Sequence, residues 1–359
     1  MSRKVLKNLI ITADDLGYST ERDNGIIQCF RQGVISGASL MMNGHCVVNA
    51  VRQATAVKMP IDLHLNLTEG YPVSTRERNS LTGEDGFMLG KMGFRQAVEE
   101  GAVDLSEVKA EIQAQIDRFH QLTGQLPIKV DGHQHVHVIP GVCVAFAEAL
   151  EKNGITMSRL PIEEDISSHV WLSRQQQEFM EGVVQQSRLA QRIFTKHGIW
   201  CPEFVGLKTM GKDMVLPHLQ SCITEAFKQQ SDILTKVKGF KSTATSVGQD
   251  KMPTSKPAEM SYRGKCSSSA SKVPFKSKEI SGEADPNPFT ADGIVCELMV
   301  HPGNRTRNSG GCGNGPDEFS QSAEREHEMR TLMSQEMLDF YKDNNISLVS
   351  FQDCMAELK

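Results

Sequence analysis

The sequence lacks the marks of a secreted, disulfide-bonded or membrane-spanning protein. Its nine cysteines are odd in number and scattered, with no Cys-x-x-Cys pair. This pattern argues against a disulfide framework and a structural zinc ribbon, and it favours reduced thiols. No apolar run is long enough to span a bilayer. The basic start at Arg3, Lys4 and Lys7 precedes an apolar run of residues 9–11 only, which is too short for a signal peptide. We therefore expect no signal peptide and a cytoplasmic or nuclear location.

An excess of positive charge and two common catalytic motifs are also missing. The formal net charge is -5 and the sequence pI is about 6.1, so we expect neither nucleic acid nor membrane as a partner. The sequence leaves open whether the protein forms a homo-oligomer. Ser19 and Ser39 lack the Gly-x-Ser-x-Gly elbow of a serine hydrolase. The glycine-rich residues 310–315 lack the spacing and the Lys-Ser/Thr tail of a phosphate-binding loop, so we interpret them as a flexible loop.

Apolar residues are slightly scarce, and the shortage has a local source. Hydrophobic residues make up 39% of the chain, and residues 238–288 consist mainly of Ser, Lys, Thr, Pro and Gly. Such a segment cannot bury enough apolar surface to offset its ordering entropy. We predict one catalytic α/β domain, formed by residues 1–235 and 293–359, and a disordered Ser/Lys-rich insertion at residues 236–292.

The rest of the chain alternates between strand and helix patterns. This order is typical of a parallel α/β fold, in which ligands bind at the carboxyl ends of the strands. The expected strands are residues 5–12, 34–42, 61–67, 130–140, 155–160, 204–207, 293–300 and 346–351. The expected helices are residues 24–32, 46–56, 105–122, 142–153, 175–196 and 322–342.

The segment of residues 130–140 (VDGHQHVHVIP) carries the strongest chemical signal. On a strand, alternate side chains share a face, so Asp131, His133, His135 and His137 would project together, with Gln134 facing away. Neutral imidazole is the commonest metal ligand, and a neighbouring carboxylate can fix its tautomer. We interpret this segment as a metal-binding or catalytic strand.

Further polar residues fall at the ends of other predicted strands. Asp14 and Asp15 follow the first strand, and adjacent acids on an extended backbone point in different directions. His64 lies on the strand of residues 61–67, and His301 comes directly after the strand of residues 293–300. Arg159 is a basic residue close to a strand end. Because parallel strands end at the same edge of a sheet, Asp14, Asp15, His64 and the histidine segment are expected to converge on one site. His301 is a second candidate, whose alternative interpretation is an ordinary turn histidine.

Together these motifs resemble the YdjC/ChbG family of carbohydrate deacetylases, and most closely its animal members. The matching segments, in order, are residues 11–17, 24–26, 33–34, 38–41, 63–70, 131–137 and 297–303. The resemblance implies a distorted (β/α) barrel-like fold and removal of acetyl groups from N-acetylated carbohydrates such as chito-oligosaccharides.

The resemblance also implies roles for individual residues. Asp14 would be the general base, and Asp15, His64 and His133 would bind a divalent metal, Mg²⁺ in the family. Imidazole ligands favour Zn²⁺, Mn²⁺ or Ni²⁺ over Mg²⁺, so the metal stays open, as does the choice between His133 and His135, because strand parity permits both. We expect His301 to protonate the leaving amine, and we list as further substrate or metal contacts His135, Asp131 and Arg159.

Two alternatives belong to other functional classes. One is another metal-dependent hydrolase on this fold, such as a phosphoesterase, which basic residues near the site would favour. The other is a non-catalytic protein that binds a sugar or a partner on the same fold. The presence of all the presumed catalytic side chains favours a deacetylase.

Overall fold

The computed structural model describes residues 6–74, 79–166, 173–244, 293–313 and 315–356, with backbone alone for residues 233–244. The described chain forms a sheet of eight parallel strands in the order β5-β4-β3-β2-β1-β7-β6, with β8 paired to β1. The strands are β1 (Leu6–Leu16), β2 (Gly37–Leu40), β3 (Ile61–Leu65), β4 (Lys129–Gly132), β5 (Met157–Ser158), β6 (Glu203–Val205), β7 (Gly293–Val300) and β8 (Ile346–Leu348).

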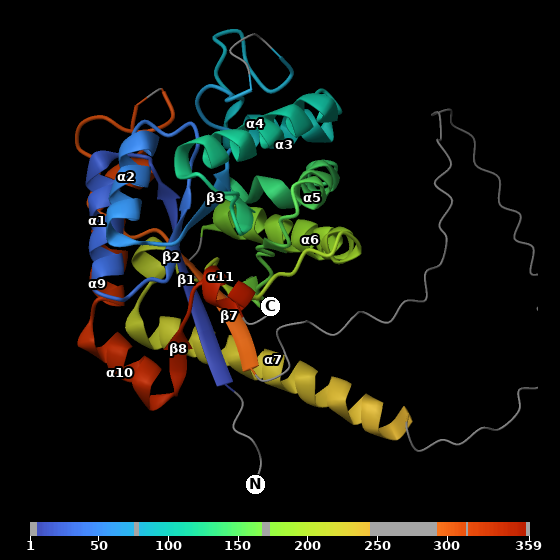
Figure 1. Cartoon of the computed structure of the whole chain (residues 1–359), viewed down its shortest axis with the longest axis vertical. Coiled ribbons are helices and arrows are strands. Elements are labelled where there is room, and N and C mark those ends of the chain that lie inside the picture. The colour runs from blue at the N-terminus through green and yellow to red at the C-terminus, as the bar shows by residue number, and fades with distance from the viewer. Residues whose placement is uncertain (1–5, 75–78, 167–172, 245–292, 314, 357–359) are drawn as a thin grey trace, which may run out of the picture.

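Helices connect the strands and flank the sheet. Figure 1 shows α1, α2 and α9 on one side of the strands and α3 to α6 on the other. The long helices are α1 (Thr20–Arg31), α2 (Val47–Val57), α3 (Gly90–Glu99), α4 (Leu105–Thr123), α5 (Val142–Lys152), α6 (Arg174–Lys196), α7 (Leu216–Ala244), α9 (Glu324–Leu332) and α10 (Gln335–Asp343). Short helices are η1 (His133–Val138), η3 (Gly211–Asp213), α8 (Glu318–Gln321) and α11 (Phe351–Ala356).

The sheet curls so that its two edges approach each other. An isolated parallel bridge joins Met157 of β5 to Trp200, just before β6, and the Ser158 amide donates to the Trp200 carbonyl at 3.0 Å. Curling gives the sheet an outer face, covered by helices, and an inner face. The predicted barrel-like α/β fold is therefore confirmed.

Alternation along the strands separates apolar and charged layers. On β7, Cys296 and Leu298 pack in the main core with the helices, while Val295 joins a small inner cluster with Ile10 and Phe351. Glu297 lies between Cys296 and Leu298 in the sequence, so its side chain is on the opposite face, the same face as that of Val295. The inner face is thus apolar where α11 lies and charged one step further toward the carboxyl ends of the strands.

Several boundaries differ from the sequence prediction, and two of the differences lie in the C-terminal half of the chain. The predicted helix of residues 322–342 is wrong, because it is two helices: α10 starts anew after Ser334, whose side chain accepts from the Met337 amide as an N-cap. Helix α7 continues to Ala244, so residues 236–244 of the predicted insertion are helical. Residues 245–292 lie outside the described residues, and the division into domain and insertion stays a prediction.

None of the helices in the described ranges is long and apolar enough to cross a membrane.

Candidate metal centre and active site

The Asp14-Asp15 pair lies at an irregular end of β1. The register of β1 against β2 shifts between Ala13 and Leu16, and Asp15 has a left-handed backbone with φ 63°. A bulge of this kind re-aims side chains. The Asp14 carboxylate consequently meets Arg159, whereas the Asp15 carboxylate meets Arg22. The two acids therefore point in different directions, as expected.

His64 is held by a carboxylate from the neighbouring strand. In the β3–β4 register it pairs with Asp131, and its Nδ1 lies 2.7 Å from Asp131 Oδ1. When Nδ1–H donates to this buried carboxylate, the lone pair of Nε2 is left free for a ligand. That Nε2 lies 3.1 Å from Asp15 Oδ1. Asp131 thus contacts the side of the His64 ring opposite to Asp15.

The predicted histidine strand is wrong in its second half. Strand β4 ends at Gly132, and His133 opens η1, inside which Gln134 and His135 have φ of 52° and 59°. Strand parity therefore does not apply. His133 turns toward Asp15, with Nδ1 2.9 Å from Asp15 Oδ1, while His137 Nε2 donates to the Arg159 carbonyl at 2.9 Å. Gln134, expected to face away, borders the same cavity.

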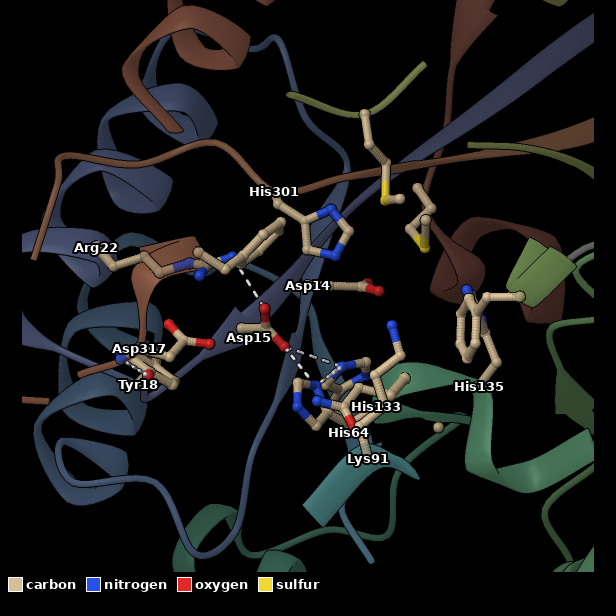
Figure 2. Close-up of a pocket in the computed structure, with 16 residues that line it drawn as sticks. Asp14, Asp15, Tyr18, Arg22, His64, Lys91, His133, His135, His301 and Asp317 are labelled. Carbon is tan, nitrogen blue, oxygen red and sulfur yellow. Dashed lines mark hydrogen bonds and ion pairs between the residues drawn. The ribbon is translucent and has the colours of Figure 1, made fainter. Parts of the chain in front are cut away.

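Three donor atoms form a compact triangle. Asp15 Oδ1, His64 Nε2 and His133 Nδ1 are separated by 2.9, 3.1 and 3.3 Å, and all three residues are buried. Two ligands at right angles on one cation, each about 2.1 Å from it, lie about 3.0 Å apart. One carboxylate and two imidazoles in this arrangement fit a single divalent cation with positions left for other ligands. Figure 2 shows Asp15 between Arg22 and the two histidines.

Protons compete with a cation for these histidines. Burial opposes a charged His64 ring, but Asp131 and Asp14 outweigh it and raise its pKa to about 9. For His133, burial likewise opposes the charge, and Glu69 and Asp15 raise the pKa to about 10. Histidine binds a metal only as the neutral ring, so cation binding must displace protons here.

A second group of possible ligands, formed by Asp14, His64 and Asp131, already holds cations of the protein itself. Arg159 donates to both oxygens of Asp14, at 2.6 and 2.9 Å. Its Nη2 also lies 3.0 Å from Asp131 Oδ2, and Lys129 Nζ lies 2.6 Å from the same oxygen. These ammonium and guanidinium groups occupy the positions that a second metal would need. The donor set therefore fits one ion.

The buried cations belong to a charged layer inside the curled sheet. Glu297 accepts from Arg159 Nε at 3.2 Å, Arg159 Nη2 at 2.9 Å and Lys129 Nζ at 3.0 Å. All three side chains are fully buried. Burial raises the pKa of Asp14 despite the neighbouring guanidinium. The layer fixes the Asp14 carboxylate and sets its proton affinity.

His301 enters the same cavity from the end of β7. Its backbone amide donates to Glu328 at 2.5 Å, and its ring packs edge-on against Phe319. Its Nδ1 has no hydrogen-bond partner among the residues that the structure describes. Burial, together with nearby Arg325 and Arg22, outweighs the opposing charge of Asp15 and holds the pKa of His301 well below its usual range. The ring is therefore neutral at neutral pH, with an open nitrogen.

A cavity of about 290 Å³ joins these groups. His301 and Asp14 face each other across it, and His135 lies on the side away from Arg22. The residues that line it are Asp14, Asp15, Tyr18, Arg22, His64, Lys91, Gly132, His133, Gln134, His135, Phe179, Met210, Met299, His301, Asp317 and Phe319. This cleft, lined by carboxylates, imidazoles and aromatic rings, is therefore the candidate site for a small ligand.

Comparison with known proteins identifies the family of the chain. The sequence profile of the YdjC-like proteins matches residues 8–343. The chain belongs to the YdjC-like family. It is 37% identical to a carbohydrate deacetylase of Danio rerio, over 96% of this chain and 97% of that protein. It is 35% identical to a carbohydrate deacetylase of Homo sapiens, over 98% of this chain and 92% of that protein.

More distant relatives share part of the sequence or the fold alone. A chitooligosaccharide deacetylase of Enterobacter sp. (strain 638) is 33% identical over 47% of this chain and 65% of that protein. A crystal structure from Enterococcus faecalis V583, described as a candidate cellobiose-phosphate cleavage protein, matches with a TM-score of 0.57 and 20% identity. That match covers 97% of this chain and 98% of the other.

Sequence reasoning missed several residues of this YdjC-like site. Lys129 directly precedes the expected strand of residues 130–140 and Glu297 lies in the strand of residues 293–300, and neither has a predicted role, although a charge in an otherwise apolar strand is a signal of a buried pair. Asp317 and Phe319 follow the glycine-rich loop, and nothing in their spacing points to the cavity. Glu69 stands in a matching segment but had no assigned role, and it lies 3.3 Å from His133 Nε2.

Proposed function

We propose that this protein is a carbohydrate deacetylase, a hydrolase that cleaves the amide bond of an N-acetylated sugar. The observation that carries the proposal is the triangle of Asp15, His64 and His133 donor atoms beside buried Asp14 and His301 in one cavity. The names of the animal and bacterial relatives add support from outside the geometry. The proposed substrate is an acetylated carbohydrate of the chito-oligosaccharide type.

We propose Asp15, His64 and His133 as the ligands of one divalent cation. Such an ion would supply Lewis acidity, which polarises an amide carbonyl and lowers the pKa of water. Mg²⁺ follows from the family resemblance, but two imidazoles among three ligands also suit Zn²⁺, Mn²⁺ or Ni²⁺. Asp131 would keep His64 in the tautomer that leaves Nε2 free.

Asp14 is proposed as the general base. Its carboxylate is held in one orientation by the two-pronged contact with Arg159, and burial raises its pKa toward the range in which a base is effective. It would accept a proton from the attacking water as the new carbon–oxygen bond forms. General-base assistance of this kind is worth about 10²–10⁴-fold in rate.

His301 is proposed as the general acid that protonates the leaving nitrogen. Because its pKa lies well below the usual range, the resting ring carries no spare proton. It can protonate the amine only after Asp14 passes on to it the proton taken from water earlier in the same cycle. The balance then closes: water supplies the oxygen of acetate and the proton of the amine, while the carbon–nitrogen bond breaks.

The direct test is acetate release from di-N-acetylchitobiose by purified, metal-stripped protein. Mg²⁺, Mn²⁺, Zn²⁺ or Ni²⁺ would each be added back, and we expect release that depends on the ion. A folded protein that binds the ions yet releases no acetate with any of them would contradict the proposal and favour a binding role. Phosphate release from a phosphomonoester under the same conditions would instead favour a phosphoesterase.

A further inference from the structure

The two histidines of the donor triangle present opposite nitrogens to it. His64 offers Nε2 and turns Nδ1 toward Asp131. His133 offers Nδ1, so its Nε2 faces outward, where Glu69 Oε1 lies at 3.3 Å, within ion-pair distance, while this nitrogen makes no hydrogen bond to the described residues. Each imidazole therefore has a carboxylate oxygen near the nitrogen that does not face the triangle.

Glu69 is held in place by its own backbone and by a neighbour of His133. The Glu69 carbonyl accepts from the side-chain amides of Asn43 and Asn66, both at 2.8 Å, and its amide donates to Asn66 Oδ1 at 3.0 Å. Gln134 Nε2 donates to Glu69 Oε1 at 2.6 Å. The left-handed backbone of Gln134 brings this amide to the carboxylate. The position of Glu69 is thus fixed from two directions.

A neutral imidazole carries a single proton, and its place decides which nitrogen can bind a metal. For His133 to present the lone pair of Nδ1, the proton must be on Nε2. A carboxylate oxygen beside Nε2 stabilises that tautomer and the ring orientation, and metal affinity depends on such outer contacts.

We propose that Glu69 is a positioning residue that fixes His133 in the tautomer with the proton on Nε2, so that Nδ1 completes the metal-binding triangle. The inference rests on the proposed metal centre and adds to it a residue that neither binds the metal nor touches the reacting atoms. Gln134 supports it by anchoring Glu69 with a neutral donor, which leaves the charge of the carboxylate intact.

Glu69 differs from Asp131 in a way that makes it testable. Asp131 is bonded to Ser39, Lys129 and Arg159 as well as to His64, so a change there disturbs the charged layer that holds Asp14. Within the described residues, the side chain of Glu69 makes polar contacts only with His133 and Gln134. Its side chain is 23% exposed, so its removal should leave the fold in place.

The experiment measures Zn²⁺ affinity of the metal-stripped full chain by competition with a chromophoric chelator. Glu69→Ala should weaken Zn²⁺ binding by about 10–100-fold, and Glu69→Gln, which keeps an acceptor oxygen, should fall between Glu69→Ala and the wild type. Glu99→Ala, which removes an exposed carboxylate from the end of α3, is the matched control and should bind like the wild type.

A second measurement reports the tautomer of the His133 ring directly. In the Zn²⁺-loaded wild type, nitrogen-detected NMR of His133 should show metal on Nδ1 and a protected proton on Nε2, and Glu69→Ala should lose that protection. Glu69→Ala that binds Zn²⁺ within twofold of the wild type, with an unchanged Nε2 proton, would overturn the proposal. If Glu69→Ala does not fold, the same comparison is made with Glu69→Gln. A wild type that fails to bind Zn²⁺ at all would instead refute the metal centre.

Discussion

Replacement of Arg159 tests how the buried charges support Asp14. The guanidinium makes contacts of 2.6 to 3.2 Å with Asp14, Asp131 and Glu297, and all of these side chains are at least 98% buried. Arg159→Met keeps much of the volume and removes the charge. Three carboxylates would then share Lys129 as their buried cation within this layer.

The expected cost is large because the remaining charges stay buried. Breaking a buried ion pair by removing one partner destabilises a protein by about 3–5 kcal/mol, against a total stability of about 5–15 kcal/mol for a typical domain. Arg159 also lowers the pKa of Asp14, so its loss should raise that pKa further. We expect a lower free energy of unfolding in urea and an acid limb of kcat/KM for acetate release that moves to higher pH.

Two further variants separate charge from geometry. Arg159→Lys retains the charge but not the two-pronged contact, so it should lose less stability than Arg159→Met while still losing activity. Arg159→Met with Glu297→Gln removes one buried charge of each sign and should cost less than the sum of the single changes. A loss below about 1 kcal/mol in Arg159→Met, with an unshifted pH profile, would refute the role given to this layer.

Two other predictions concern the scaffold of the site. A Cβ on Gly70 would lie 1.9 Å from the Cys312 carbonyl oxygen, whereas Gly90 has the same left-handed φ and open space around it. Gly70→Ala should therefore lower the free energy of unfolding by on the order of 2 kcal/mol more than Gly90→Ala, and equal losses in urea unfolding would contradict this. Burial raises the pKa of Asp23 from 3.8 to about 8, so the folded state favours the protonated form and wild-type stability falls as pH rises through this window. Asp23→Asn should gain stability relative to the wild type between pH 4 and 8, and a difference independent of pH would show that Asp23 does not titrate in this way.

The architecture could be predicted because it follows from local patterns. Alternating strand and helix segments fix a parallel sheet, and the polar residues at strand ends then converge at one edge. Asp15 and His64 meet for this reason, although β1 and β3 are not neighbours in the sheet. The strand of residues 293–300 was correct to the residue because a continuous apolar run is the signature of a buried parallel strand.

The features that could not be predicted from the sequence depend on backbone geometry and on partners far away along the chain. The alternation of residues 131–137 is the same in a strand and in the observed turn, so nothing in the pattern reveals the left-handed Gln134 and His135. The cationic partners of Glu297, Arg159 and Lys129, lie 138 and 168 residues away along the chain, which no local pattern encodes. The role proposed for Glu69 likewise depends on the ring orientation of His133.

The most direct test of the central claim is Asp14→Asn in the metal-loaded protein, with acetate release and sugar binding measured on the same sample. Asp339→Asn, an exposed change on α10, is the control and should act like the wild type. If Asp14 is the base of a deacetylase, release of acetate from di-N-acetylchitobiose should fall by about 10²–10⁴-fold, while the metal and the sugar remain bound. Release at the wild-type rate in Asp14→Asn would contradict the account.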